Sequence, residues 1–262
     1  MSVSQSEATK MLEYVAEEVM SYTDIVFSAT ELSKTRLSIE GFGSALSLHY
    51  QGERLTVTCE HVTSRGNLVY GGPEWLDKPI APTSSERSVS PTRGLGNCSR
   101  LDLALLEELS SSNATPYPLE RSEMITGEWL KAQRGTAAFV HGFWSNKAKC
   151  FPYPDGMFYL EAPYYSAIGP LKEVRETEIV GDFAERSILF KNDDAFMQLR
   201  NLTPTGGDRD LRGISGSGLW MVYDDSPVLV GVVLGRKPRR RNRHLIRATP
   251  VWQLISLAER LL

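Results

Sequence analysis

The stretch that decides the fold reads GISGSGL, occupies residues 213–219 and runs directly into the apolar segment Leu219–Val222. Glycine adopts backbone angles that other residues avoid, so a serine between two glycines predicts a sharp turn that exposes one hydroxyl. Successive amides in such a turn can point at one spot. A hydroxyl beside converging N–H donors is what acyl transfer needs, because it supplies a nucleophile and a pocket for an oxyanion. The pattern predicts Ser215 as a nucleophile; a plain Gly-Ser surface hairpin is the alternative.

Two upstream stretches supply the partners that such a serine needs. LTVTCEHV, residues 55–62, alternates like a strand and ends near His61, while RLDLALL, residues 100–106, carries Asp102 into an apolar strand. Known catalytic triads include the chain order histidine, aspartate, serine, in which the histidine is the base, the aspartate orients it and the serine is the nucleophile. Taken singly, the histidine could be a core residue at a strand end and the aspartate a surface carboxylate. Together they predict a catalytic triad.

A second carboxylate competes for the orienting role. Asp77 begins the segment 77–100, which is rich in Pro, Ser, Gly and Arg without periodicity and is predicted to be a surface loop. We favour Asp102 because its apolar strand can bury a carboxylate against an imidazole, whereas Asp77 lies in polar sequence.

These stretches resemble the trypsin-like serine peptidases with the chymotrypsin fold, and their motif style is closest to the bacterial Deg/HtrA-type protease domain. GFGSAL, residues 41–46, resembles the glycine-bearing strand that opens the first barrel of such enzymes, and GTAAFVHGF, residues 135–143, an early strand of the second. Residues 228–235 and 245–251 resemble the last two strands. The resemblance covers about residues 38 to 262.

The resemblance implies a role for each matching residue. His61, Asp102 and Ser215 would act as base, orienter and nucleophile, and the amides of Gly213 and Ser215 would form the oxyanion hole. The strand that pairs with substrate in these enzymes corresponds here to Leu234, Gly235 and Arg236.

The sequence departs from the family pattern at two positions of the nucleophile turn. Ile214 stands where the digestive enzymes have an aspartate that pairs with a new N-terminus, so activation of that kind is not expected. Gly218 stands where proline is usual. The position that sets charge preference in trypsin corresponds to Arg209, which Asp208 and Asp210 flank, so the preference at the cleaved residue stays open.

Short strands with turn signals dominate between residues 24 and 250, which predicts an all-β fold. With the resemblance, we expect two packed, six-stranded antiparallel β-barrels with a helix at each end of the chain. Apolar residues recur at helical spacing in segments 4–20 and 250–261. The expected units are an N-terminal amphipathic helix in 1–23, a first barrel in 24–115 and a second barrel with the C-terminal helix in 116–262.

Composition indicates the cellular compartment and the kinds of ligand that the protein is expected to bind. The chain has 262 residues, 41% of them hydrophobic, and a net charge of −3. No run of about 18 apolar residues and no signal-like segment is found, so membrane spanning and secretion are not expected. Three cysteines, at positions 59, 98 and 150, predict reduced thiols and a cytoplasmic protein. No His or Cys pair has metal-ligand spacing, so neither metal nor cofactor is expected.

The functional prediction is an intracellular serine endopeptidase that works through an acyl-enzyme intermediate on a protein or peptide substrate. An inactive trypsin-like domain that binds proteins is the alternative, and a regulatory protein partner is compatible with either. A nucleic-acid-binding role rests only on the segment Arg236–Arg247, which holds seven Lys or Arg residues. The net negative charge of the chain disfavours it.

Overall fold

A computed structural model describes residues 5–33, 36–63, 68–71, 94–107, 115–143, 149–152, 158–161, 164–183, 186–190, 198–200, 213–236 and 245–262. The elements in chain order are α1 (Gln5–Met20), β1 (Thr23–Ser33), β2 (Arg36–Tyr50), β3 (Glu53–Thr58), α2 (Glu60–Thr63), β4 (Leu68–Gly71), β5 (Gly94–Cys98), β6 (Leu103–Glu107), β7 (Tyr117–Pro118), η2 (Leu119–Ser122), α3 (Gly127–Ala132), β8 (Ala137–Phe143), β9 (Lys149–Pro152), β10 (Phe158–Glu161), β11 (Tyr164–Val174), β12 (Ile179–Asp182), β13 (Arg186–Phe190), β14 (Gln198–Arg200), β15 (Gly218–Tyr223), β16 (Ser226–Arg236), β17 (Leu245–Pro250) and α4 (Val251–Leu261).

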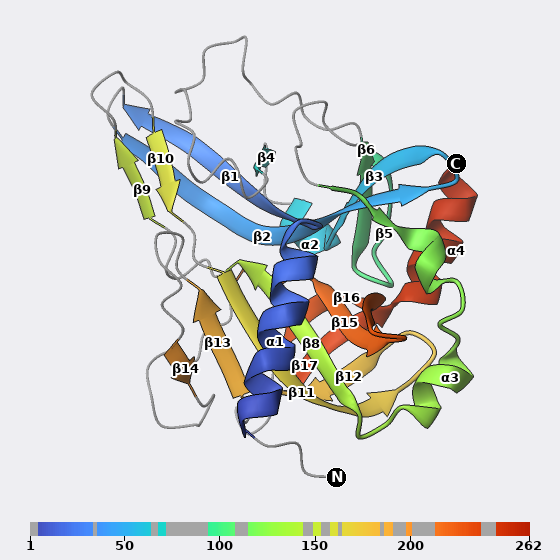
Figure 1. The fold of residues 1–262 in the computed structure, drawn as a ribbon. Helices are drawn as coiled ribbons and strands as arrows, with labels where there is room; N and C mark the ends of the chain where they lie inside the picture. The colour runs from blue at the N-terminus through green and yellow to red at the C-terminus, as the bar shows by residue number, and fades with distance from the viewer. Residues whose placement is uncertain are drawn as a thin grey trace.

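The C-terminal half contains a closed antiparallel barrel. Its six strands follow the order β12-β17-β16-β15-β8-β11, and pairing between β11 and β12 closes the ring, while β13 and β14 extend from β11. The barrel occupies the lower half of Figure 1, coloured green to red. The predicted β class and one of the two expected barrels are therefore confirmed.

The N-terminal half forms a second sheet, in the upper half of Figure 1. The strand order is β4-β1-β2-β3-β6-β5, with β7 pairing parallel to β2. Within the described residues no pair joins the two ends of this sheet, so the other six-stranded barrel stays a prediction, as do the boundaries of the three expected units. The prediction of a surface loop over residues 77–100 is wrong in part, because residues 94–98 form β5 and pair with β6.

Both predicted terminal helices are present. Leu12, Val15, Ala16 and Val19 recur at helical spacing along α1 and are buried, and the helix contacts β8, β11 and β16. In Figure 1 α1 crosses the front of the barrel and ends at the level of the upper sheet. The hydroxyl of Tyr14 donates to the Asp225 carbonyl at 2.9 Å, which ties the helix to the β15–β16 turn.

The packing around position 218 explains why a glycine occupies it. A Cβ at this position would lie 2.2 Å from Nε1 of Trp220, which is fully buried. The indole in turn packs against the rings of Tyr22 and Tyr117, at centroid distances of 5.9 and 5.1 Å. Neither proline nor any other side chain fits at 218 while Trp220 keeps this position, so packing against the indole accounts for this glycine.

His141 is a buried ionisable residue inside the barrel. Its Nδ1 lies 2.6 Å from the hydroxyl of Ser166, its cross-strand neighbour on β11, and desolvation lowers its pKa from 6.5 to about 3. The folded protein thus keeps this imidazole neutral between about pH 3 and pH 6.5, whereas the unfolded chain takes up a proton there. The free energy of unfolding must fall as the pH drops through this window.

We expect His141→Gln to flatten this acid-side loss. One protonation difference amounts to about 1.4 kcal/mol per pH unit, so native unfolding stability should lose about 2 kcal/mol between pH 7 and pH 5 through this residue alone. Urea unfolding of native and variant protein at both pH values measures the difference, and His49→Gln on β2 serves as the control. Equal losses in native protein and His141→Gln would contradict this assignment.

Candidate active site

The three predicted catalytic residues come from three separate segments. His61 lies in α2, a single helical turn that begins where β3 ends. Asp102 lies in the turn between β5 and β6, and Ser215 lies in the turn before β15. Each therefore lies at the end of a strand and not inside one, where backbone curvature frees a side chain from the sheet.

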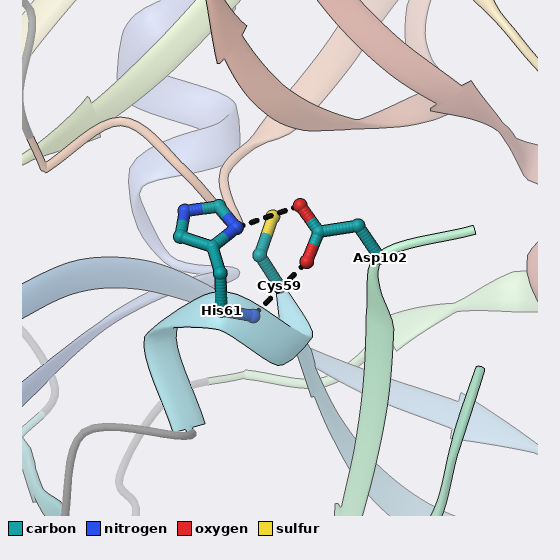
Figure 2. A group of neighbouring side chains, drawn as sticks. All are labelled: Cys59, His61 and Asp102. Carbon is teal, nitrogen blue, oxygen red and sulfur yellow. Dashed lines mark hydrogen bonds and ion pairs between the residues drawn. The ribbon is translucent and has the colours of Figure 1, made fainter. Parts of the chain in front are cut away.

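His61 and Asp102 form a closely coupled pair, shown in Figure 2. Nδ1 of the ring lies 2.6 Å from Oδ2 of the carboxylate, and the backbone amide of His61 donates to Oδ1 at 3.0 Å. The Asp102 carbonyl also accepts from the amide of Glu60 at 3.2 Å. Both carboxylate oxygens are thus used to fix the position of the histidine, whose side chain stays 41% exposed.

The electrostatic surroundings keep Asp102 ionised. Partial burial by itself raises its pKa, but hydrogen bonds from the ring and amide of His61, with the charges of His61 and Arg247, bring the net pKa below the ordinary value. The residue has a φ of +53°, a left-handed conformation that is uncommon for a non-glycine residue. Aspartate adopts this conformation more readily than most residues, and Asp224 and Asp225 share it in the β15–β16 turn.

The turn that carries Ser215 needs its glycines. Gly213 and Gly216 have φ values of +102° and +91°, and a Cβ at Gly216 would lie 1.9 Å from the Ser44 carbonyl oxygen. The glycine-rich pattern thus does produce the predicted sharp turn. Ser215 is half-buried, and its hydroxyl donates to the Leu234 carbonyl at 3.1 Å.

Ser44, a residue that the sequence analysis did not single out, clamps this turn from β2. Its amide donates to the Ser215 carbonyl and its hydroxyl to the Gly213 carbonyl, both at 2.8 Å. The same hydroxyl accepts from the amide of Phe143 at 2.9 Å. One buried serine thus joins the N-terminal sheet, the barrel and the turn that carries Ser215.

The Val233 carbonyl joins the histidine segment to the serine segment. It accepts from the amide of Gly216 at 2.8 Å and from the thiol of Cys59 at 3.1 Å. Cys59 comes two residues before His61, and Gly216 comes directly after Ser215. The sulfur also lies within 4.8 Å of a ring nitrogen of His61 and an oxygen of Asp102. This shared acceptor connects the chain segment that carries His61 to the turn that carries Ser215.

Cys59, His61 and Asp102 are also residue types that bind zinc, and their ligand atoms all lie within 4.8 Å of one another. The thiol proton is already donated to the Val233 carbonyl, and burial, followed by the charge of Asp102, raises the pKa of Cys59 well above its ordinary value. Without a metal ion the neutral thiol is therefore favoured. In this state Cys59 is part of the hydrogen-bonded connection at the Val233 carbonyl.

The amides expected to form an oxyanion hole belong to Gly213 and Ser215. Neither donates to an acceptor within the described part of the chain. Gly213 has a φ of +102°, a backbone angle that glycine adopts at little cost and other residues rarely adopt. Among the described residues, these two amides have no backbone acceptor and belong to the turn that carries the half-buried Ser215 hydroxyl.

The expected substrate-binding residues Leu234, Gly235 and Arg236 form the end of β16. Pairing with β15 reaches only to Val232, whereas β17 pairs with the other edge as far as Arg236. In the described residues one edge of this segment therefore carries no strand. Gly235 has φ of +124°, and a Cβ there would lie 3.5 Å from Oγ of Ser215, so the bare backbone reaches the hydroxyl.

Some sequence predictions lie outside the described residues. They are the competing carboxylate Asp77, the specificity position Arg209 and most of the basic segment, residues 237–244. Of the three cysteines, Cys59 and Cys98 are free thiols. No helix in the described ranges has the length and apolar character needed to cross a membrane.

Comparison with known proteins assigns no family to the chain. None of the models of known protein families matches the chain, and a search of the curated proteins finds no significant match either. The functional argument therefore depends on the arrangement of the residues themselves.

Proposed function

We propose that this protein is a serine endopeptidase with a chymotrypsin-like fold of two β-barrels, and that His61, Asp102 and Ser215 are its catalytic triad. The observation that carries the proposal is the junction at the Val233 carbonyl, which joins the segment of a carboxylate-bound histidine to a glycine turn bearing a half-buried serine. A nucleophile, a base and a group that orients the base are the parts that acyl transfer requires.

In the proposed reaction His61 accepts the Ser215 proton as Oγ bonds to the carbonyl carbon of a peptide. The imidazolium then gives that proton to the amine nitrogen as the C–N bond breaks, which leaves an acyl-enzyme. In deacylation His61 accepts a proton from a water molecule as its oxygen bonds to the acyl carbon. The imidazolium returns that proton to Oγ of Ser215 as the ester bond breaks, which releases the carboxylic acid. Asp102 fixes the ring tautomer and stabilises the imidazolium. The Gly213 and Ser215 amides stabilise the oxyanion, a contribution of about 3–4 kcal/mol for one donor in related sites.

Among the described residues no strand pairs with one edge of Leu234–Arg236, and this supports a substrate that binds as an extended strand. Backbone groups on an unpaired strand edge can pair with a peptide of any sequence, while side-chain pockets set preference. An extended protein or peptide segment is therefore the proposed substrate class.

One observation favours the second candidate, an inactive domain that binds proteins. The Ser215 hydroxyl donates its proton to the Leu234 carbonyl at 3.1 Å, and attack on a substrate requires the side chain to turn that proton toward His61. A fluorophosphonate probe separates the two functions, because it labels only a serine that its surroundings activate.

We expect the probe to label the native protein and Ser217→Ala, and to leave Ser215→Ala unlabelled. Ser217 is a matched control, since it lies two residues away, is fully buried and has no hydrogen-bond partner for its hydroxyl among the described residues. Mass spectrometry of the labelled peptide identifies the modified residue. An unlabelled native protein beside a labelled reference peptidase would favour the binding domain.

A further inference from the structure

The hydroxyl of Ser44 makes two hydrogen bonds whose directions are fixed by its partners. The backbone amide of Phe143 on β8 can only donate, so Oγ accepts from it, at 2.9 Å. The single hydroxyl proton is then available for the Gly213 carbonyl, which can only accept, at 2.8 Å. Ser44 is fully buried, and a Cβ at Gly142 would lie 2.7 Å from its Oγ. The glycine at 142 therefore leaves the room that this hydroxyl occupies.

Three successive peptide units of the turn that carries Ser215 are held by their carbonyls. The Gly213 carbonyl accepts from the Ser44 hydroxyl, and the Ser215 carbonyl accepts from the Ser44 amide, both at 2.8 Å. The carbonyl between them, of Ile214, accepts from the amide of Ser217 at 3.0 Å. In a planar trans peptide the N–H points away from the C=O, so the bond to the Ile214 carbonyl sets the direction of the Ser215 amide.

The amide of Gly213 is held less directly. It belongs to the peptide before Gly213, so its direction relative to the Gly213 carbonyl depends on φ and ψ of this residue. The φ value is +102°, and glycine has more backbone freedom than any other residue. Within the described part of the chain, the bond from the Ser44 hydroxyl is the one that holds the Gly213 carbonyl. Without this bond, Gly213 can rotate about both angles and turn its amide away from Ser215.

We propose that Ser44 is a positioning residue of the oxyanion hole, because its hydroxyl holds Gly213 in the backbone conformation that lets the Gly213 and Ser215 amides face one oxyanion. This inference rests on the proposed function of these two amides. Ser44 acts through the Gly213 carbonyl and does not touch the reacting atoms. Donors stabilise an oxyanion most when they are oriented before the reaction, so loss of the hydroxyl should slow the chemical step and affect substrate binding little.

Two variants separate this role from simple packing. Ser44→Ala removes the hydroxyl and keeps the backbone hydrogen bond to the Ser215 carbonyl, so it tests the side chain alone. Thr58→Val is the matched control, because Thr58 is fully buried on β3 and its hydroxyl donates to the Ser44 carbonyl at 2.8 Å. Each variant loses a buried hydroxyl at the same place in the fold, but only Ser44→Ala releases the Gly213 carbonyl.

Backbone ¹⁵N relaxation measures the order of the Gly213 and Ser215 amides without any turnover. In the native protein and in Thr58→Val we expect order parameters of about 0.85, the value of rigid backbone. In Ser44→Ala the Gly213 value should fall below about 0.6, the range of flexible segments. Equal order parameters in all three proteins would overturn the inference.

The rate of fluorophosphonate labelling measures the consequence for chemistry, because negative charge develops on the phosphoryl oxygen as Ser215 attacks the probe. Removal of an oxyanion donor costs about 10²–10³ in rate, so disorder of one donor in Ser44→Ala should slow labelling by about 10- to 100-fold. Thr58→Val should label at nearly the native rate. Ser44→Cys keeps a weaker donor and should fall between, and it keeps the test valid if Ser44→Ala does not fold.

A purely structural role of Ser44 predicts a different pattern. Ser44→Ala and Thr58→Val would then lose thermal stability to a similar extent and label at equal rates, which would overturn the inference while the peptidase proposal stands. A native protein that the probe does not label would instead contradict the proposed function, and the oxyanion role of Ser44 would fall with it. The relaxation data would still show whether the hydroxyl orders the turn.

Discussion

Ser215→Ala is expected to lower the kcat of peptide hydrolysis by a factor on the order of 10⁶, because removal of a triad nucleophile leaves no group to form the acyl-enzyme. The fold should survive. Within the described parts of the chain the half-buried hydroxyl makes one hydrogen bond, to the Leu234 carbonyl, and a bond of this kind contributes about 1 kcal/mol. Turnover of a peptide substrate and thermal unfolding of the same preparation measure the two effects.

Ser217→Ala provides the control for this experiment, since it removes a hydroxyl from the same glycine-rich turn without touching the proposed chemistry. It should retain nearly full activity. If purified Ser215→Ala keeps the turnover of the native protein, the triad assignment is wrong, whatever the probe labels.

Asp102→Asn is expected to reduce kcat by about 10⁴, the loss typical of a triad whose orienting carboxylate becomes an amide. Here the carboxylate accepts from Nδ1 of the ring through Oδ2 and from the His61 amide through Oδ1. An asparagine that still accepts from the amide must point its NH₂ group at Nδ1, which selects the wrong tautomer of the ring. Steady-state kinetics at a fixed pH test this prediction.

Two further variants make the Asp102→Asn result specific. Glu60→Gln alters a carboxylate next to His61 that is occupied by the Ser99 hydroxyl, and it should change kcat little. Asp77→Asn tests the competing carboxylate. A larger loss in Asp77→Asn than in Asp102→Asn would show that the wrong residue was assigned as the orienter.

The depressed pKa of Asp102 adds a stability effect with a defined sign. The ionised carboxylate stabilises the folded protein above the ordinary aspartate value of about 3.9, and this contribution is lost as the pH falls below it. Asp102→Asn lacks the titrating group, so this part of the acid-side loss should be missing from its unfolding curve.

Local sequence was enough to predict features that local physics controls. The spacing of apolar residues predicted both terminal helices. The glycines around Ser215 predicted a sharp turn because only glycine adopts such angles cheaply. The sequence also singled out His61 and Asp102, which the structure brings to hydrogen-bonding distance.

Tertiary structure alone decided how these local features meet. Cys59 and Val233 are 174 positions apart, Ser44 and Gly213 are 169 apart, and Leu101 and Thr249 are 148 apart, yet each pair is joined by a buried hydrogen bond. Periodicity reports which face of a strand is buried but not which distant residue covers it. The position of the Asp102 turn depends on such a long-range contact, because only packing between the barrel and the N-terminal sheet brings Leu101 next to Thr249.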